Sequence, residues 1–67
     1  MTGRDPKVSP VAGDIVATND DEYRVQERDG GRVLVCSAAT GAREWWYVGQ
    51  WQAMALRSGR VLARGRA

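Results

Sequence analysis

The chain has 67 residues, 43% of them hydrophobic and 27% charged, and its formal net charge at pH 7 is +2. A chain of this length forms one domain at most and buries only about 60% of the surface that its unfolded form exposes. One cysteine and no histidine exclude an internal disulfide and a zinc site built from these residue types, so association with another chain is the remaining way to add stability.

No stretch of the sequence resembles a signal peptide or a membrane span. The N-terminus carries charges with no apolar stretch behind them, and nowhere do the roughly 18 consecutive apolar residues that cross a bilayer occur. A lone cysteine fits a reducing compartment. We therefore expect a soluble, cytoplasmic protein.

The charges are distributed unevenly along the chain. Residues 1–56 carry six basic and eight acidic side chains, whereas residues 57–67 carry no acid and four arginines: Arg57, Arg60, Arg64 and Arg66. Such a basic arm can bind nucleic acid or an acidic partner, and it can equally be a solvated chain end. Both interpretations stay open at the level of sequence.

Residues 1–13 are predicted to form a flexible leader. They contain two prolines, and each proline removes a backbone donor and disfavours helix in the residue before it. Regular structure is expected to begin near Asp14, with a short strand of β-branched residues at 15–17. The polar residues 18–21 favour a turn after it.

Residues 23–28 and 32–37 are predicted to form a β-hairpin. The first segment alternates, so Tyr23 and Val25 share one face. The other face would carry Arg24, Gln26 and Arg28. A two-residue turn at Asp29-Gly30 provides the positive φ that a tight hairpin needs. This turn predicts three cross-strand pairs: Glu27 with Arg32, Val25 with Leu34, and Tyr23 with Cys36. In this strand Cys36 would be a small buried hydrophobic residue.

Residues 43–48 are predicted to form the next strand, after a turn at 38–42. Residues 50–54 are then expected to form one helical turn, followed by a last strand at 55–57. A rival interpretation makes residues 50–57 a two-turn helix, because Gln, Ala, Met, Leu and Arg favour helix. Residues 58–67 would be a basic tail that is frayed or forms a short extra strand near 60–62.

This succession of elements predicts an all-β domain. It resembles the SH3-like small barrels, which include the Tudor, chromo and KOW-type modules. The resemblance covers residues 14–57 and implies a five-stranded SH3-like barrel with one helical turn before the last strand. Because a fold does not determine a function, the resemblance implies only that the chain is a binding module.

The sequence lacks the motifs of the common enzyme active sites, such as a histidine base, a glycine-rich phosphate loop with a lysine, or a nucleophile elbow. We therefore predict no catalysis, cofactor or metal. Residues 8–13 nevertheless resemble the leader of the trimethoprim-insensitive type II dihydrofolate reductases, which are SH3-like barrels that form tetramers around one pore. A reductase of this kind is a further alternative, although Trp45-Trp46-Tyr47-Val48 departs from the Val-Gln-Ile-Tyr strand that lines their pore.

The adjacent Trp45 and Trp46 are the sharpest functional signal. Neighbouring residues of a strand point to opposite faces, so one indole is expected to enter the core and the other to face outward. A turn at Thr40-Gly41 would turn Trp45 and Tyr47 inward, whereas a loop one residue longer would turn Trp46 and Val48 inward.

The outward aromatic is expected to lie beside arginines and to form a binding surface with them. The candidate residues of this surface are Arg24, Gln26, Arg28, Arg43, Trp45, Trp46 and Tyr47. An exposed indole beside arginines can anchor a protein interface, stack a nucleic-acid base, or be covered by the chain's own tail or the turn at Trp51. The leading hypothesis is recognition of a protein partner, which includes a second copy of the chain. The alternative is nucleic-acid binding assisted by the basic arm.

Overall fold

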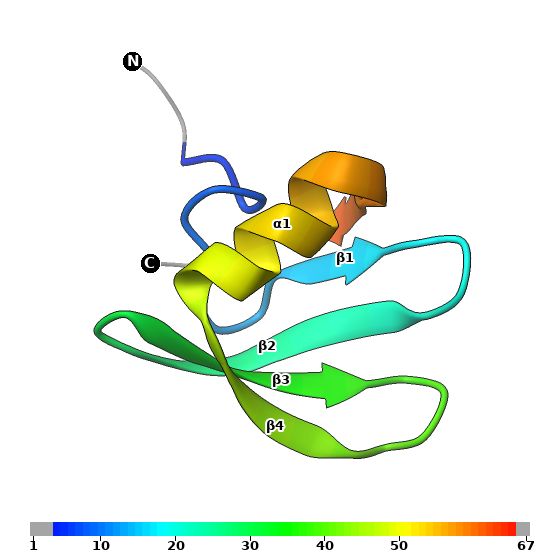
Figure 1. Cartoon of the computed structure of the whole chain (residues 1–67), viewed down its shortest axis with the longest axis horizontal. Helices are drawn as coiled ribbons and strands as arrows, with labels where there is room; N and C mark the ends of the chain where they lie inside the picture. Colours follow the sequence, from blue (N-terminus) through cyan, green and yellow to red (C-terminus); the bar gives the residue numbers. More distant parts are fainter. Residues whose placement is uncertain (1–3, 66–67) are drawn as a thin grey trace.

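The structure is a computed structural model that describes residues 4–65. Within this range the chain forms five antiparallel strands in one sheet and one helix (Figure 1). The elements in chain order are β1 (Ile15–Ala17), β2 (Glu22–Asp29), β3 (Arg32–Ser37), β4 (Arg43–Tyr47), α1 (Val48–Ser58) and β5 (Arg60–Ala63). An all-β chain was predicted, and its coarser part is confirmed: the chain is mostly β, with five strands and a helical element before the last strand.

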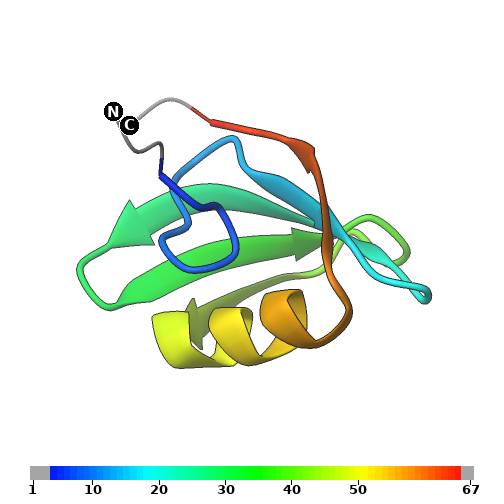
Figure 2. The ribbon, with the colours of Figure 1, turned by 90° about the horizontal axis from the view of Figure 1, so that it is seen from above.

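The sheet is open, and the predicted closure into a barrel is wrong. Its strand order is β4-β3-β2-β1-β5, so β4 and β5 are the two edges and are not paired with each other. Helix α1 leads from β4 to β5 along one face of the sheet (Figures 1 and 2). The helix therefore connects the two edge strands without bringing them together.

Helix α1 is longer than the single turn that we expected, and the predicted strand at 55–57 is wrong. The rival interpretation, a helix in this region, is the better one. The helix begins after Tyr47, whose N–H donates to the side-chain oxygen of Gln50 at 2.9 Å. It buries Trp51 and Ala55, which lie one turn apart. The helix ends where Gly59 N–H donates to the Ala55 carbonyl at 2.9 Å. No helix in residues 4–65 is long and apolar enough to cross a membrane.

The hairpin of β2 and β3 has a different register from the predicted one. Its turn residues are Gly30 and Gly31, with φ of 57° at Gly30, and Asp29 pairs with Arg32. A bulge at Gln26 then shifts the register again, so that Val25 lies opposite Val35. The predicted pairs are therefore wrong, because the turn lies one residue later and the bulge adds one more residue to β2.

The core lies between the sheet and α1. Its buried members are Val16, Val25, Val33, Val35, Trp51 and Ala55. Trp46 packs against this cluster, with its ring centre 5.3 Å from that of Tyr23 and 6.4 Å from that of Trp51. The three aromatic rings therefore form a cluster of tilted ring contacts that joins the sheet to the helix.

Residues 4–13, in the segment for which a flexible leader was expected, fold into turns on the same face of the sheet as α1 (Figures 1 and 2). Pro6 and Pro10 are buried. The Trp51 indole N–H donates to the Pro6 carbonyl at 2.8 Å, and the Gln52 amide donates to the Val8 carbonyl at 2.8 Å. These bonds tie the N-terminal turns to the helix.

The buried carboxylate of Asp14 joins the two ends of the described chain. The Arg4 guanidinium donates to both of its oxygens, at 2.6 and 3.0 Å. The N–H groups of Val11 and Gly65 add bonds of 2.9 and 2.7 Å. Burial raises the pKa of the Asp14 carboxyl, but the hydrogen bonds from Arg4, Gly65 and Val11 outweigh burial and hold the pKa below its usual value. We call the Asp14 carboxylate together with Arg4, Val11 and Gly65, which donate to it, the Asp14 clamp.

Candidate functional site

The face of the sheet opposite α1, which we call the outer face, is covered by no other described element (Figure 1). The register of β2, β3 and β4 arranges its side chains in three cross-strand rows. The first row holds Arg24, Cys36 and Arg43. The middle row holds Glu27, Leu34 and Trp45. The third row holds Asp29, Arg32 and Tyr47.

Strand β4 separates the two neighbouring indoles, as predicted. Trp46 packs inward against the core, and so does Val48 at the start of α1. Trp45 points to the outer face and is 42% exposed, and Tyr47 on the same side is 69% exposed. Of the two alternatives, the one with Trp46 inward is confirmed, and the one with Trp45 and Tyr47 inward is wrong. Trp46 therefore packs with the core and does not lie on the outer face, where the predicted surface residues Trp45 and Tyr47 lie.

Arg32 belongs to the outer face and was missing from the predicted surface. Its guanidinium carbon lies 4.8 Å from the ring centre of Trp45, and its Nη2 lies 3.2 Å from the carboxylate of Asp29. A cation over an exposed indole contributes about 0.5–1 kcal/mol. Arg32 therefore contributes a weak favourable contact to the orientation in which Trp45 lies. Its alternation with Leu34 along β3 was the sequence signal that could have identified it.

The bulge at Gln26 removes Arg28 from the outer face. After the extra residue the alternation of β2 is reversed, and Arg28 lies opposite the buried Val33. Its guanidinium donates to the carbonyls of Pro10 at 2.7 Å and Gly30 at 2.6 Å. The predicted grouping of Arg28 with Arg24 is therefore wrong. Arg28 supports the N-terminal turns, whereas Gln26 is exposed at the bulge.

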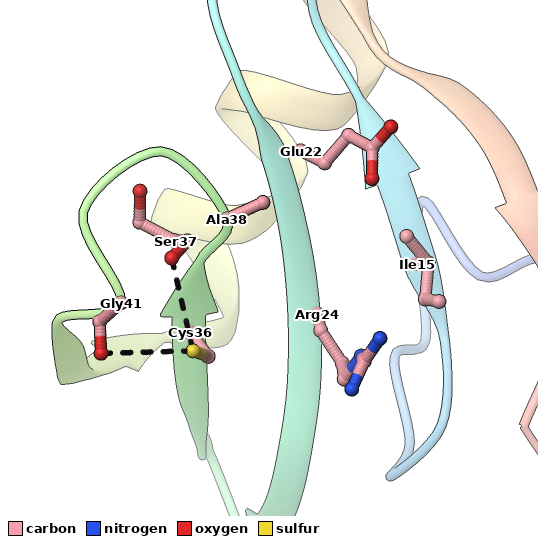
Figure 3. Close-up of a pocket in the computed structure, with 7 residues that line it drawn as sticks. All are labelled: Ile15, Glu22, Arg24, Cys36, Ser37, Ala38 and Gly41. Atoms are coloured by element: carbon pink, nitrogen blue, oxygen red, sulfur yellow. Dashed lines mark hydrogen bonds between the residues drawn. The ribbon is translucent and has the colours of Figure 1, made fainter.

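A shallow hollow of about 250 Å³ lies beside the first row, next to the turn between β3 and β4 (Figure 3). It is lined by Ile15, Glu22, Arg24, Cys36, Ser37, Ala38 and Gly41. Small-molecule sites usually measure about 300–1,000 Å³, so the hollow is too small for most such ligands. The half-buried Cys36 thiol lies here, 3.9 Å from the Gly41 carbonyl, and not in the core as predicted.

Three of the four arginines of the predicted basic arm lie within the described residues, and each lies in a different part of the fold. Arg57 lies in the last turn of α1, and Arg60 is exposed in β5. The Arg64 guanidinium donates to the Arg4 carbonyl at 3.3 Å, close to the Asp14 clamp. Arg66 lies outside the described residues.

The three rows combine exposed aromatic rings with charges of both signs. They hold three arginines and two carboxylates, and Glu22 lies at the adjacent hollow. Among residues 4–65, no three His, Cys, Asp or Glu side chains lie close enough together to hold a metal ion. No family model, curated protein or solved structure matches the chain. The functional argument therefore depends on the outer face itself.

Proposed function

We propose that the chain is a non-enzymatic binding module that recognises a protein partner through its outer face. We also propose that its topology is of the SH3-like kind. The strand order and the helix before β5 support that topology, although the sheet is open. We advance no reductase activity, because β4 lacks the Val-Gln-Ile-Tyr pattern of the reductase pore.

The observation that carries the proposal is the exposure of two large aromatic side chains on one side of an edge strand. Trp45 and Tyr47 are 42% and 69% exposed, and Arg32 lies over the indole. Trp, Tyr and Arg are the residue types that most often anchor protein interfaces. The carboxylates of Glu27 and Asp29 lie in the same rows, and such mixed charges suit a protein partner better than a polyanion.

Photo-crosslinking in the source cells tests this function. A photoreactive p-benzoylphenylalanine replaces Tyr47 in one variant, and it replaces Leu56 in a control variant. Leu56 is 59% exposed on α1, away from the outer face. We expect defined protein adducts from position 47 and few from position 56. Equal adducts from both positions, or adducts to nucleic acid alone from position 47, would contradict the proposal.

Nucleic-acid binding is the second candidate, favoured by one observation. Neither Arg24 nor Arg43 forms an ion pair with any described residue. Both lie in the first row, next to the middle row that contains Trp45. Stacking on an exposed indole contributes roughly 1–3 kcal/mol per base. Titration with single- and double-stranded oligonucleotides at low salt tests this candidate. Quenching of tryptophan fluorescence that weakens steeply with salt supports it, and unchanged fluorescence excludes it.

A further inference from the structure

The outer face is complementary to itself, and we propose that its partner is a second copy of this chain. This inference rests on the proposed function and names its partner. The two copies would pack outer face to outer face about a two-fold axis that runs along the middle row. Such an axis keeps β2 over β2 and β4 over β4, and it exchanges the first row with the third.

Exchange of these two rows brings opposite chemistries together. Arg24 of one copy would lie over Asp29 of the second copy. Arg43 would lie over the ring of Tyr47 of the second copy, where a cation–π contact is favourable. Because the axis is two-fold, each of these contacts is made twice. Complementary charges of this kind fix the register in which two surfaces meet.

The middle row supplies the apolar centre of the same contact. Leu34 and Trp45 would each lie against their own copies. Sheets that pack face to face lie about 10 Å apart, a gap that the side chains of one row from each copy can fill. The contact would remove from water the exposed surface of Trp45 and Tyr47 while leaving Arg32 stacked on the indole.

One pair in this arrangement is unfavourable. Glu27, the third member of the middle row, would lie near Glu27 of the second copy. The Glu27→Gln variant removes the repulsion between the two Glu27 carboxylates without changing the shape of the side chain. We therefore expect this variant to associate more tightly than the wild type, by about threefold. Weaker association of Glu27→Gln would contradict the proposed axis.

Pairing of two β4 edges is a less suitable contact. Val48 N–H donates to the Gly31 carbonyl of the turn before β3. In an antiparallel pair every second residue directs its backbone groups to the neighbouring strand, so the even-numbered residues of β4 bond to β3 and the odd-numbered residues face the open edge. Of these odd-numbered residues, Tyr47 already donates its N–H to the Gln50 side chain. Only the backbone groups of Arg43 and Trp45 are then left to bond to the β4 edge of a second copy. A two-fold pair formed by these residues would place two copies of Glu44 opposite each other.

The size of the patch predicts a weak dimer. Three strands about 4.8 Å apart and five residues long form a surface well below the roughly 800 Å² per partner of stable interfaces. We therefore expect association that depends on protein concentration. Sedimentation equilibrium of the full chain up to millimolar concentration measures it, and a wild type that stays monomeric throughout this range overturns the inference.

Charge reversal tests the axis itself. In Arg24→Glu and in Asp29→Arg, each homodimer would contain two like-charge contacts, so we expect each variant alone to dimerise at least about tenfold more weakly. An equimolar mixture of the two variants restores two opposite-charge contacts, and we expect its affinity to return to within about threefold of wild type. A mixture as weak as the separate variants, or separate variants as strong as wild type, overturns the inference.

Two charge-matched variants serve as controls. Arg57→Glu lies on α1 and Asp20→Arg lies in the turn before β2, both outside the three rows. We expect both to dimerise like wild type, and circular dichroism checks that all variants are folded.

The failure of this inference is distinguishable from failure of the proposed function. A monomeric chain that still crosslinks to other proteins from position 47 loses only the inference, whereas a chain without protein adducts loses the function.

Discussion

Asp14 is the residue whose carboxylate should contribute most to the stability of the fold. It is buried and accepts hydrogen bonds from Arg4, Val11 and Gly65. In Asp14→Asn the Arg4 guanidinium keeps its bond to the Gly65 carbonyl but loses its charged partner, and breaking such a buried ion pair costs roughly 3 kcal/mol. We expect the free energy of unfolding, measured by urea denaturation at neutral pH, to fall by about that amount. The exposed Asp20→Asn should change it little, and equal losses in the two variants would contradict the assignment.

The pH dependence of stability should report the same residue. The pKa of Asp14 in the folded chain lies below its usual value of 3.8, so the unfolded chain binds the proton more tightly. The stabilisation is therefore fully present above that value and is lost as the pH falls through the lower, folded pKa. We expect urea midpoints of the wild type to decline as the pH is lowered below 3.8, and those of Asp14→Asn to decline less steeply.

Gly59 is required because of the space around it and not because of its backbone angles. A Cβ at this position would lie 2.6 Å from Val16 Cγ1 and 2.7 Å from the Ala55 backbone. Gly59→Ala should therefore destabilise the fold by about 2 kcal/mol. The control is Gly49→Ala in α1, where a Cβ would meet nothing within 4 Å, and we expect it to stabilise by about 0.5–1 kcal/mol. Thermal unfolding followed by circular dichroism distinguishes the two outcomes.

The two neighbouring indoles should differ in what their removal does. Trp46→Ala removes a ring that packs on Tyr23 and Trp51, and we expect a loss of about 3 kcal/mol in the free energy of unfolding. Trp45→Ala should cost less than about 1 kcal/mol and should abolish binding at the outer face. Iodide quenching of fluorescence provides an independent check, because Trp45 is exposed whereas Trp46 is half-buried and Trp51 is buried. Equal destabilisation by both substitutions would contradict the assignment.

At the level of elements, the strands were predictable but the way in which they meet was not. The alternation of Tyr23 and Val25 with polar residues identified β2 correctly. The register depended on which two of Asp29, Gly30 and Gly31 form the turn and on a bulge at Gln26. A one-residue choice between adjacent turn-formers leaves no hydrophobic signature, so the sequence could not decide it.

The helix was underestimated for a different reason. Its buried stripe consists of only two residues, Trp51 and Ala55, with Met54 half-buried beside them. The strand predicted at 43–48 stopped before Gly49, yet Gly49 lies in the first turn of α1, which forms despite the weakening effect of a glycine. The burial of Trp51 against the N-terminal turns then stabilises a helix that local propensity alone did not establish.

For the whole molecule, the decisive difference from expectation is the space between β4 and β5. A barrel closes only if the edge strands pair with each other, whereas here β4 and β5 stay at the two edges of one open sheet and α1 connects them along the chain. The separation of Trp45 from Trp46 was predictable, because it follows from the geometry of one strand. The residues that surround Trp45 were not predictable, because the positions of Arg32 and Asp29 beside it depend on the register of three strands.

The Asp14 clamp also determines how this chain can be joined to others. Because Arg4 and Gly65 meet at one carboxylate and are bonded to each other at 2.9 Å, the chain enters and leaves the domain at a single point. A short linker could close the described segment into a ring, with new ends opened at the exposed turn around Gly41. Inserted as a unit into a loop of another protein, the domain would need little spacing between its points of attachment.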